Sequence, residues 1–118
     1  MKAVNRLLVL SACYICWLSP CLAYTGNEVL PWCKQNVLSA KTLVEAYQWG
    51  QCSGLVEALV GVGDALNSQL RFCPPRGSTQ GQAVDIVVQY LEKFPATRHL
   101  EFVVLALVAL QDAWPCRR

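Results

Sequence analysis

The sequence predicts an all-α fold, a small bundle of about four helices stapled by disulfide bonds. Three observations lead to this prediction. From Cys52 onward the apolar residues recur at helical rather than alternating spacing. Proline and glycine signals separate the apolar segments from one another. After an apolar leader, the chain carries an even set of four cysteines, Cys33, Cys52, Cys73 and Cys116, a pattern typical of a disulfide framework in an oxidising compartment.

The leader, residues 1–23, has the three parts of an export signal. Lys2 and Arg6 provide a basic start, an apolar stretch follows, and Cys21-Leu22-Ala23 provides a small-residue ending. The apolar stretch is about a dozen residues long, short of the roughly 20 that span a bilayer. We therefore expect a signal peptide that is cleaved after Ala23, and a mature protein in the periplasm.

The same leader leaves a second outcome open. The segment Leu10-Ser11-Ala12-Cys13 is similar to the lipobox of bacterial lipoproteins, which would place a lipid on Cys13 and hold the protein at a membrane. Few strongly apolar residues precede this box, so we expect soluble export rather than lipidation.

The expected mature chain, residues 24–118, is close to electrically neutral. Cleavage of the leader removes two of the ten Lys and Arg residues, which leaves eight basic residues against eight Asp and Glu residues. No basic field remains to bind nucleic acid, and Arg117 with Arg118 is too small a patch for that purpose. No linker or repeat divides the segment, so we expect a single domain. In a domain of this size two disulfides would contribute about 2–4 kcal/mol each.

The first long helix is predicted over residues 54–70. One stripe of this helix is apolar and faces the core, and a neighbouring stripe of small residues would let a second helix approach closely. The apolar stripe comprises Leu55, Leu59, Val62, Leu66 and Leu70. The small stripe comprises Gly54, Ala58, Gly61 and Ala65. We expect the helix to stop at Cys73-Pro74-Pro75.

Two further helices are predicted after this one. Thr79, with Gln82 three residues later, is a capping-box signature that opens a helix, and Pro95 ends it. The core face of this helix carries Val84, Val87, Val88 and Leu91. The last helix, over residues 98–113, has no polar face in its centre, so the bundle or a partner subunit must cover nearly every side of it.

Residues 27–50 give a weaker pattern. Their first part suggests a short helix up to Cys33, and residues 37–49 suggest another turn or two before Gly50. Antiparallel packing of consecutive helices places the end of the first long helix and the end of the last one on the same side of the bundle. This geometry favours a bond between Cys73 and Cys116, which leaves Cys33 with Cys52, although four cysteines allow three pairings.

Few residues could serve catalysis or metal binding. His99 is the single histidine, and we expect it near a helix start as a solvated residue or a contact to a partner rather than as a catalytic base. The mature segment has no Cys-x-x-Cys pair, and oxidation would remove its thiols as ligands or nucleophiles. Gly61 and Gly63 lack the preceding strand and the following Lys-Ser/Thr of a phosphate-binding loop. We expect no enzyme activity, no metal and no cofactor.

An ordered set of short motifs covers nearly the whole mature chain. The motifs are Asn27-Glu28-Val29-Leu30 with Cys33, Cys52-Ser53-Gly54, Phe72-Cys73-Pro74, Thr79-Gln80, Val87-Val88-x-Tyr90-Leu91, Pro95, His99, Ala106-Leu107 and Ala113-Trp114-Pro115-Cys116. This order resembles the Rap/Tai family of immunity proteins, which protect bacteria from peptidoglycan-amidase effectors of type VI secretion.

The resemblance implies an all-helical periplasmic protein, often a homodimer, that binds an amidase and blocks its substrate groove with a protruding loop. The two candidate loops cover residues 71–78 and 94–99. Guanidinium groups in these loops can make several hydrogen bonds to a protein partner. The candidate partner-binding residues are Arg71, Arg76, Arg98 and His99.

Two other functions remain open on the sequence. A periplasmic chaperone of the acid-stress type would also use a disulfide and an apolar dimer interface, but one histidine and balanced charges offer little basis for a sharp acid switch. An envelope lipoprotein or adaptor subunit would depend on lipidation of Cys13.

Overall fold

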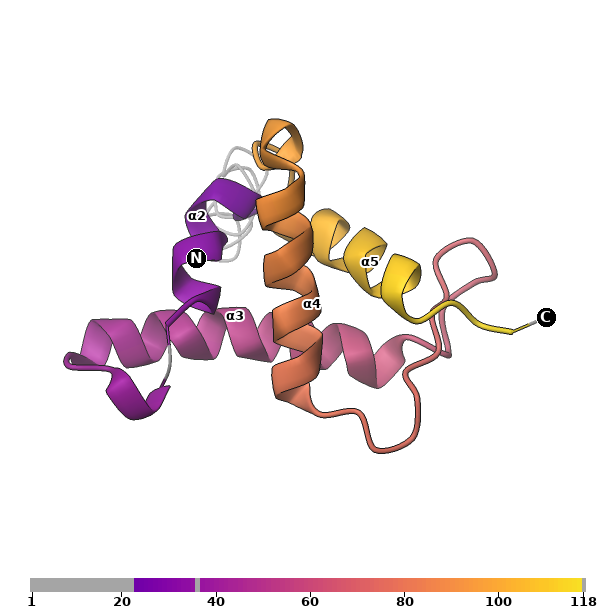
Figure 1. The fold of residues 1–118 in the computed structure, drawn as a ribbon, viewed down its shortest axis with the longest axis horizontal. Helices are drawn as coiled ribbons and strands as arrows, with labels where there is room; N and C mark the ends of the chain where they lie inside the picture. Colours follow the sequence, from indigo (N-terminus) through magenta and orange to yellow (C-terminus); the bar gives the residue numbers. More distant parts are fainter. Residues whose placement is uncertain (1–22, 36, 118) are drawn as a thin grey trace, which may run out of the picture.

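The computed structural model describes residues 23–35 and 37–117, which form four α-helices and two short 3-10 helices (Figure 1). The α-helices are α2 (Gly26–Cys33), α3 (Leu43–Val62), α4 (Gln80–Lys93) and α5 (Phe102–Ala113). The 3-10 helices are η1 (Val37–Ser39) and η2 (Pro95–Thr97). The predicted all-α class with about four helices is confirmed. The expected signal peptide and the Cys13 alternative fall outside the described residues.

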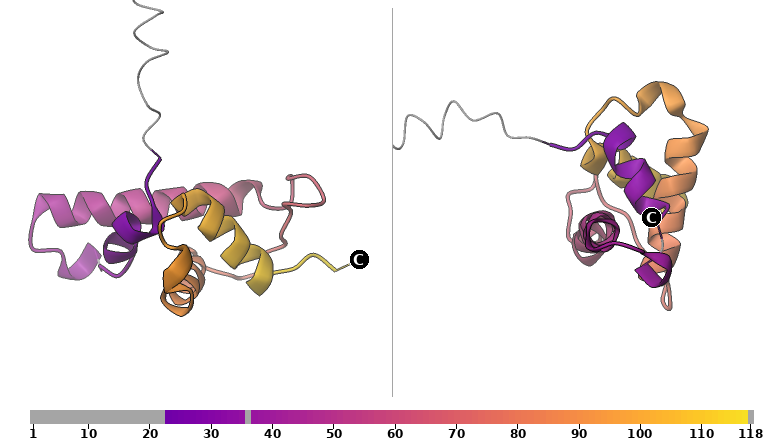
Figure 2. Two further views of the ribbon diagram at one scale, coloured as in Figure 1. Left: turned by 90° about the horizontal axis from the view of Figure 1, so that it is seen from above. Right: turned by 90° about the vertical axis from the view of Figure 1, so that its left-hand side faces the viewer.

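Helix α3 forms one side of the molecule, and the other three α-helices pack against the same face of it (Figures 1 and 2). Helix α4 crosses α3 steeply, with α2 and α5 on either side of the crossing (Figure 1). The core lies between these elements. Its fully buried large side chains are Phe72, Phe102, Leu91, Leu110, Val29, Val56, Val87 and Cys52.

Both favoured disulfide pairings are present. Cys33 is bonded to Cys52, which fastens the end of α2 to the middle of α3. Cys73 is bonded to Cys116, which fastens the segment after α3 to the segment after α5 across a sequence separation of 43. The first bond lies in the core, whereas the second is only partly buried.

Helix α3 begins eleven residues earlier than predicted, at Leu43. The hydroxyl of Thr42 accepts a hydrogen bond from the backbone N–H of Glu45 at 3.1 Å, which caps the new start. The short turn expected before Gly50 is therefore the first half of this helix, and Gly50 does not interrupt it. A glycine costs about 1 kcal/mol relative to alanine in a helix, and a helix of 20 residues tolerates that cost.

The same helix ends at Val62, eight residues earlier than predicted. Gly63 is buried against the ring of Phe72, and its carbonyl accepts a hydrogen bond from the Phe72 backbone N–H at 3.2 Å. This hydrogen bond closes residues 63–72 into a loop, so the chain leaves the helix at Gly63 and returns to the core at Phe72. Val62 and Leu70, both predicted to face the core, are 46% and 42% exposed as a result.

The predicted close approach along the small-residue stripe of α3 is wrong for the described chain. Cys52 and Val56, about one turn apart, face the core and fix the rotation of the helix. Gly54 and Gly61 then lie on the far side, where an added Cβ would meet no atom within 4 Å. The disulfide, rather than the size of the side chains, decides which face of α3 is buried.

Helix α4 follows the prediction closely. The Thr79 backbone N–H donates to Gln82 Oε1 at 2.9 Å, and the Thr79 hydroxyl accepts from the Gln82 N–H at 3.2 Å. This is the predicted capping box. Val84, Val87 and Leu91 are buried, as their helical spacing indicated. The helix ends at Lys93, just before Pro95.

Helix α5 begins at Phe102 rather than at residue 98. Residues 98–102 pair with the chain at the start of α2: the Asn27 N–H donates to the Arg98 carbonyl at 2.9 Å, and the Phe102 N–H donates to the Tyr24 carbonyl at 2.7 Å. We predicted that α5 would be covered on nearly every side. Within this chain the cover of α5 is incomplete, because Val103 and Val104 are 43% and 49% exposed.

An ion pair ties α2 to α4 at the surface. Lys34 Nζ lies 2.6 Å from Glu92 Oε1, with the two side chains 55% and 46% exposed. The hydrogen bond from Lys34, followed by its charge, lowers the pKa of the Glu92 carboxyl. A pair this exposed adds little to stability, so the disulfides and the core hold these helices together.

The contact between Gly63 and Phe72 predicts that Gly63→Ala is destabilising. The added Cβ would lie 2.6 Å from the Phe72 ring, which is fully buried and has no room to move. We expect a loss of about 1–3 kcal/mol in the free energy of unfolding, measured by urea denaturation.

Gly61→Ala is the matched control, since its Cβ meets nothing and its position is helical. It should stabilise the protein by about 0.5–1 kcal/mol. Equal effects of the two substitutions would contradict the proposed role of the Gly63–Phe72 contact.

Candidate partner-binding surface

The connection between α3 and α4, residues 63–79, leaves the helical body at one end of α3 (Figure 1). Its first part, the 63–72 loop, closes on itself. The Asn67 side chain accepts hydrogen bonds from the backbone N–H groups of Gln69 and Leu70 at 3.0 and 3.1 Å. The Arg71 N–H donates to the Asn67 carbonyl at 2.9 Å. The loop therefore carries its own internal hydrogen bonds.

Three contacts attach this loop to the rest of the molecule. Phe72 is fully buried in the core at the base of the loop. The Cys73 N–H donates to the Trp114 carbonyl at 2.8 Å, beside the disulfide from Cys73 to Cys116. Gln111 Nε2 donates to the Gln69 carbonyl at 2.8 Å. A loop that is held in this way loses little conformational entropy when it binds a partner.

A hollow of about 430 Å³ opens beside the 63–72 loop, and we call it the Arg71 hollow. It is lined by Ser68, Arg71, Gln111, Pro115, Cys116 and Arg117. Arg71 and Arg117 are exposed, and neither forms an ion pair within the described residues. Two free guanidinium groups at one hollow favour a carboxylate, which each can bind in a bidentate manner.

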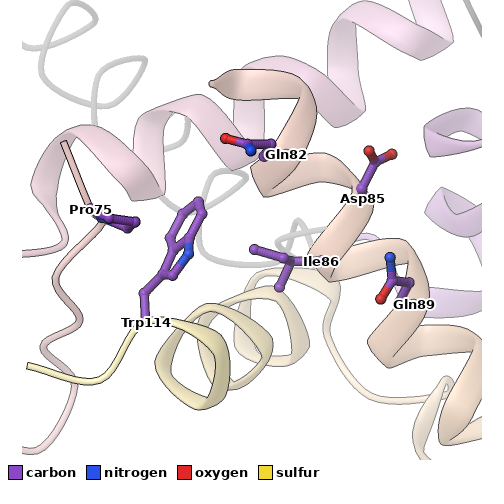
Figure 3. Close-up of a pocket in the computed structure, with 6 residues that line it drawn as sticks. All are labelled: Pro75, Gln82, Asp85, Ile86, Gln89 and Trp114. Carbon is purple, nitrogen blue, oxygen red and sulfur yellow. The ribbon is translucent and has the colours of Figure 1, made fainter. Parts of the chain in front are cut away.

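A second hollow, of about 310 Å³, lies between α4 and the residues that flank the same disulfide (Figure 3). We call it the Trp114 hollow. It is lined by Pro75, Gln82, Asp85, Ile86, Gln89 and Trp114. Trp114 faces α4 across the hollow. Ile86 is the α4 side chain that projects toward Trp114, and Asp85 and Gln89 lie beyond it on the same helix (Figure 3). The Cys73–Cys116 bond thus borders two hollows of different charge.

The four candidate residues from the sequence lie at opposite ends of α4. Arg71 and Arg76 are exposed in the connection before α4, and Arg76 precedes Gly77, whose φ of 83° forms a turn closed by Ser78 N–H on the Pro75 carbonyl at 3.1 Å. Arg98 and His99 follow α4. The structure does not bring the four residues into a single site.

Arg98 and His99 are engaged with the backbone around them. Arg98 Nε donates to the Leu91 carbonyl at 2.5 Å, and its Nη2 donates to the Glu92 carbonyl at 3.3 Å, which satisfies the end of α4. His99 Nδ1 lies 3.0 Å from the Ala96 carbonyl. Their contact with a partner stays a prediction. Arg71 and Arg76 form no side-chain hydrogen bond or ion pair with the described residues, and Arg71 also has a hollow beside it.

Sequence reasoning did not select Asp85, Trp114 or Arg117 as binding residues. The signal that could have found them is the favoured disulfide from Cys73 to Cys116. This bond requires residues 114–117 to lie beside residues 71–75, which brings an aromatic ring and a second arginine to the loop.

The described residues contain no group of three or more His, Cys, Asp or Glu side chains placed to hold a metal ion. Cys33, Cys52, Cys73 and Cys116 all form disulfides, so none is a thiolate nucleophile. Within the same residues, every helix is too short or too polar to cross a bilayer. The two disulfides indicate a protein that works outside the cytoplasm.

Comparison with known proteins adds one finding. A sequence profile described as Rap1a immunity proteins matches residues 25–116. The matched segment includes all four helices, both disulfides and both hollows except Arg117. Curated proteins and solved structures give no match.

Removal of the second disulfide should loosen the loop without unfolding the helices. In Cys73→Ala/Cys116→Ala we expect a loss of about 2–4 kcal/mol in the free energy of unfolding. Hydrogen exchange should become faster for the backbone amides of residues 69–75 and stay slow in α4. The core pair Cys33→Ala/Cys52→Ala is the comparison, and its largest increase in exchange should lie in α2 and in α3 around residue 52 rather than in residues 69–75. Unaltered exchange in the first variant would show that the loop does not depend on the bond.

Proposed function

The chain belongs to the Rap1a immunity protein family, and from that premise we propose that it protects the cell from a peptidoglycan-amidase effector of type VI secretion. It binds the effector in the periplasm and occludes the substrate groove with the connection between α3 and α4. Inhibition is by stoichiometric binding, without catalysis.

The observation that carries this proposal is the closed 63–72 loop with Arg71 beside its base. An inhibitor that blocks a groove needs a protruding segment that stays ordered when free, because ordering a flexible loop would reduce the binding free energy. The hydrogen bonds of Asn67, the burial of Phe72 and the disulfide at Cys73 meet that need. The Arg71 hollow offers a carboxylate site at the edge of the contact.

The compartment follows from the disulfides and from the leader. Two intramolecular disulfides form and persist in an oxidising compartment such as the periplasm. We propose that residues 1–23 are the signal peptide that delivers the chain there, and that residues 24–118 are the working domain. An amidase that degrades cell wall meets its substrate in the same compartment, so inhibitor and target share a location.

A second subunit fits the apolar surface that the chain leaves uncovered. Leu100, Val103 and Val104 are 44%, 43% and 49% exposed near the start of α5. Burying them against another copy would complete the cover that the composition of α5 calls for. We propose a homodimer through this surface, which leaves the 63–72 loop of each subunit free for the target.

One observation supports a different function, a periplasmic chaperone. Leu43, Val44 and Tyr47, at the start of α3, are 87%, 62% and 62% exposed, and such a patch could hold unfolded clients. A chaperone would suppress aggregation of unrelated denatured proteins at acidic pH. Suppression of aggregation together with failure to inhibit any amidase would favour this alternative.

The immunity proposal predicts equimolar inhibition of a periplasmic amidase by the purified mature chain. Any amidase encoded beside the gene would be the first to test, with hydrolysis of peptidoglycan as the measurement. Arg71→Ala should raise the inhibition constant on the order of 10- to 100-fold, the effect of losing a charge-assisted contact at a protein interface.

Lys41→Ala is the matched control, because Lys41 is an exposed cation just before α3, at the end of that helix away from the loop. It should leave the inhibition constant within about twofold. An unaffected amidase would contradict the proposed target, and equal effects of the two variants would contradict the role of the loop.

A further inference from the structure

The Trp114 hollow has one wall, formed by Trp114 and Pro75, that is apolar and held in place by backbone hydrogen bonds. The Trp114 N–H donates to the Leu110 carbonyl at 2.8 Å and its carbonyl accepts from the Cys73 N–H at 2.8 Å, so the backbone that carries the indole is held on both sides. Trp114 and Ile86 are partly buried against the core. The indole and Pro75 lie on one side of the hollow and α4 on the other (Figure 3). A ligand would therefore meet a preformed aromatic surface.

The α4 side of the hollow carries a carboxylate without a partner. Asp85 is exposed and forms no hydrogen bond or ion pair with any residue that the structure describes. Gln89, one turn later, likewise makes none, whereas Gln82 is engaged in the cap of α4. Lys34, which lines a neighbouring hollow together with Asp85, is paired with Glu92. The carboxylate of Asp85 is therefore available to pair with a cation of another molecule.

An apolar surface with a free carboxylate at its far edge suits an arginine side chain (Figure 3). The methylene stem of arginine packs on apolar surface, and its fork of N–H groups binds a carboxylate with two hydrogen bonds. An anion would be repelled by Asp85. A purely apolar side chain would remove the carboxylate from water without pairing it, at a cost in free energy.

We propose that the Trp114 hollow receives an arginine side chain of the effector, whose methylene stem packs along Trp114 and Ile86 and whose guanidinium pairs with Asp85. This inference rests on the proposed function, since it assigns the partner of the same surface. The Arg71 hollow and the Trp114 hollow then recognise opposite charges on either side of the Cys73–Cys116 bond. A target must present an acid and an arginine at matching positions, which gives specificity as well as affinity.

The hollow can be tested without the effector. Nα-acetyl-arginine methylamide is titrated into the ¹⁵N-labelled mature protein, and the indole N–H signal of Trp114 is followed by NMR. We expect a saturable shift with a dissociation constant on the order of 1–10 mM, as for a small ligand with one ion pair and one apolar contact. Asp85→Asn should weaken the binding at least ~5-fold.

Two controls distinguish recognition of the charge of the probe from recognition of its size. The citrulline analogue of the probe, which is neutral and of the same shape, should cause no saturable shift. Asp64→Asn removes an exposed carboxylate in the 63–72 loop and should leave binding of the arginine probe unchanged. Equal shifts with both probes, or no shift at Trp114, would overturn the proposal. A Trp114 shift that depends on protein concentration alone would assign the hollow to a second copy of the chain and overturn it as well.

Whether the Trp114 hollow contacts the effector needs one further measurement. In the amidase assay, Asp85→Asn should raise the inhibition constant about 5- to 10-fold. Probe binding with unchanged inhibition would show that the hollow binds guanidinium but does not contact the effector. Failure to inhibit any amidase would remove the proposed target and leave the titration result standing, so the two failures are distinguishable.

Discussion

The disulfide between Cys73 and Cys116 is the constraint on which the rest of the proposed binding surface depends. It joins a segment that has just left α3 to a segment that has just left α5, and neither segment has regular structure of its own. The hydrogen bond from Cys73 N–H to the Trp114 carbonyl and the burial of Phe72 act at the same place. Because of these contacts, the 63–72 loop and both hollows have a fixed shape before any partner arrives, which lowers the entropic cost of binding.

The other disulfide sets the orientation of α3, and with it the surface of the whole molecule. Bonding Cys52 to Cys33 turns Val56 inward and leaves Gly54 and Gly61 outward. Polar and apolar residues are distributed all around α3, so its side-chain pattern alone does not select a buried face. A covalent bond makes that selection, and one consequence is the exposed apolar patch at the start of the helix. In this small domain the core and the disulfides act together, since neither defines the arrangement alone.

How far the sequence predicts this structure depends on whether the signal is local. Helix α4 is well predicted because its start and end lie in adjacent residues, the capping box of Thr79 and Gln82 and the stop at Pro95. The predicted end of α3 and start of α5 are wrong because distant residues decide them: Phe72 ends α3 at Gly63, and the pairing of residues 24–27 with 98–102 delays α5. The start of α3 was missed although its signal, the cap formed by Thr42 and Glu45, is local. The same holds for the site. Arg71 is identifiable as an arginine in a loop, whereas the meeting of Asp85 and Trp114 requires the folded chain.

The central claim is that the connection between α3 and α4 and the segment after α5 form the surface that contacts the effector. Hydrogen–deuterium exchange of the mature protein, alone and with an equimolar amidase that it inhibits, tests this most directly. We expect new protection in residues 63–79 and 114–117, with little change in residues 43–47. Protection confined to residues 43–47 or to residues 94–99, with the loop unchanged, would contradict it.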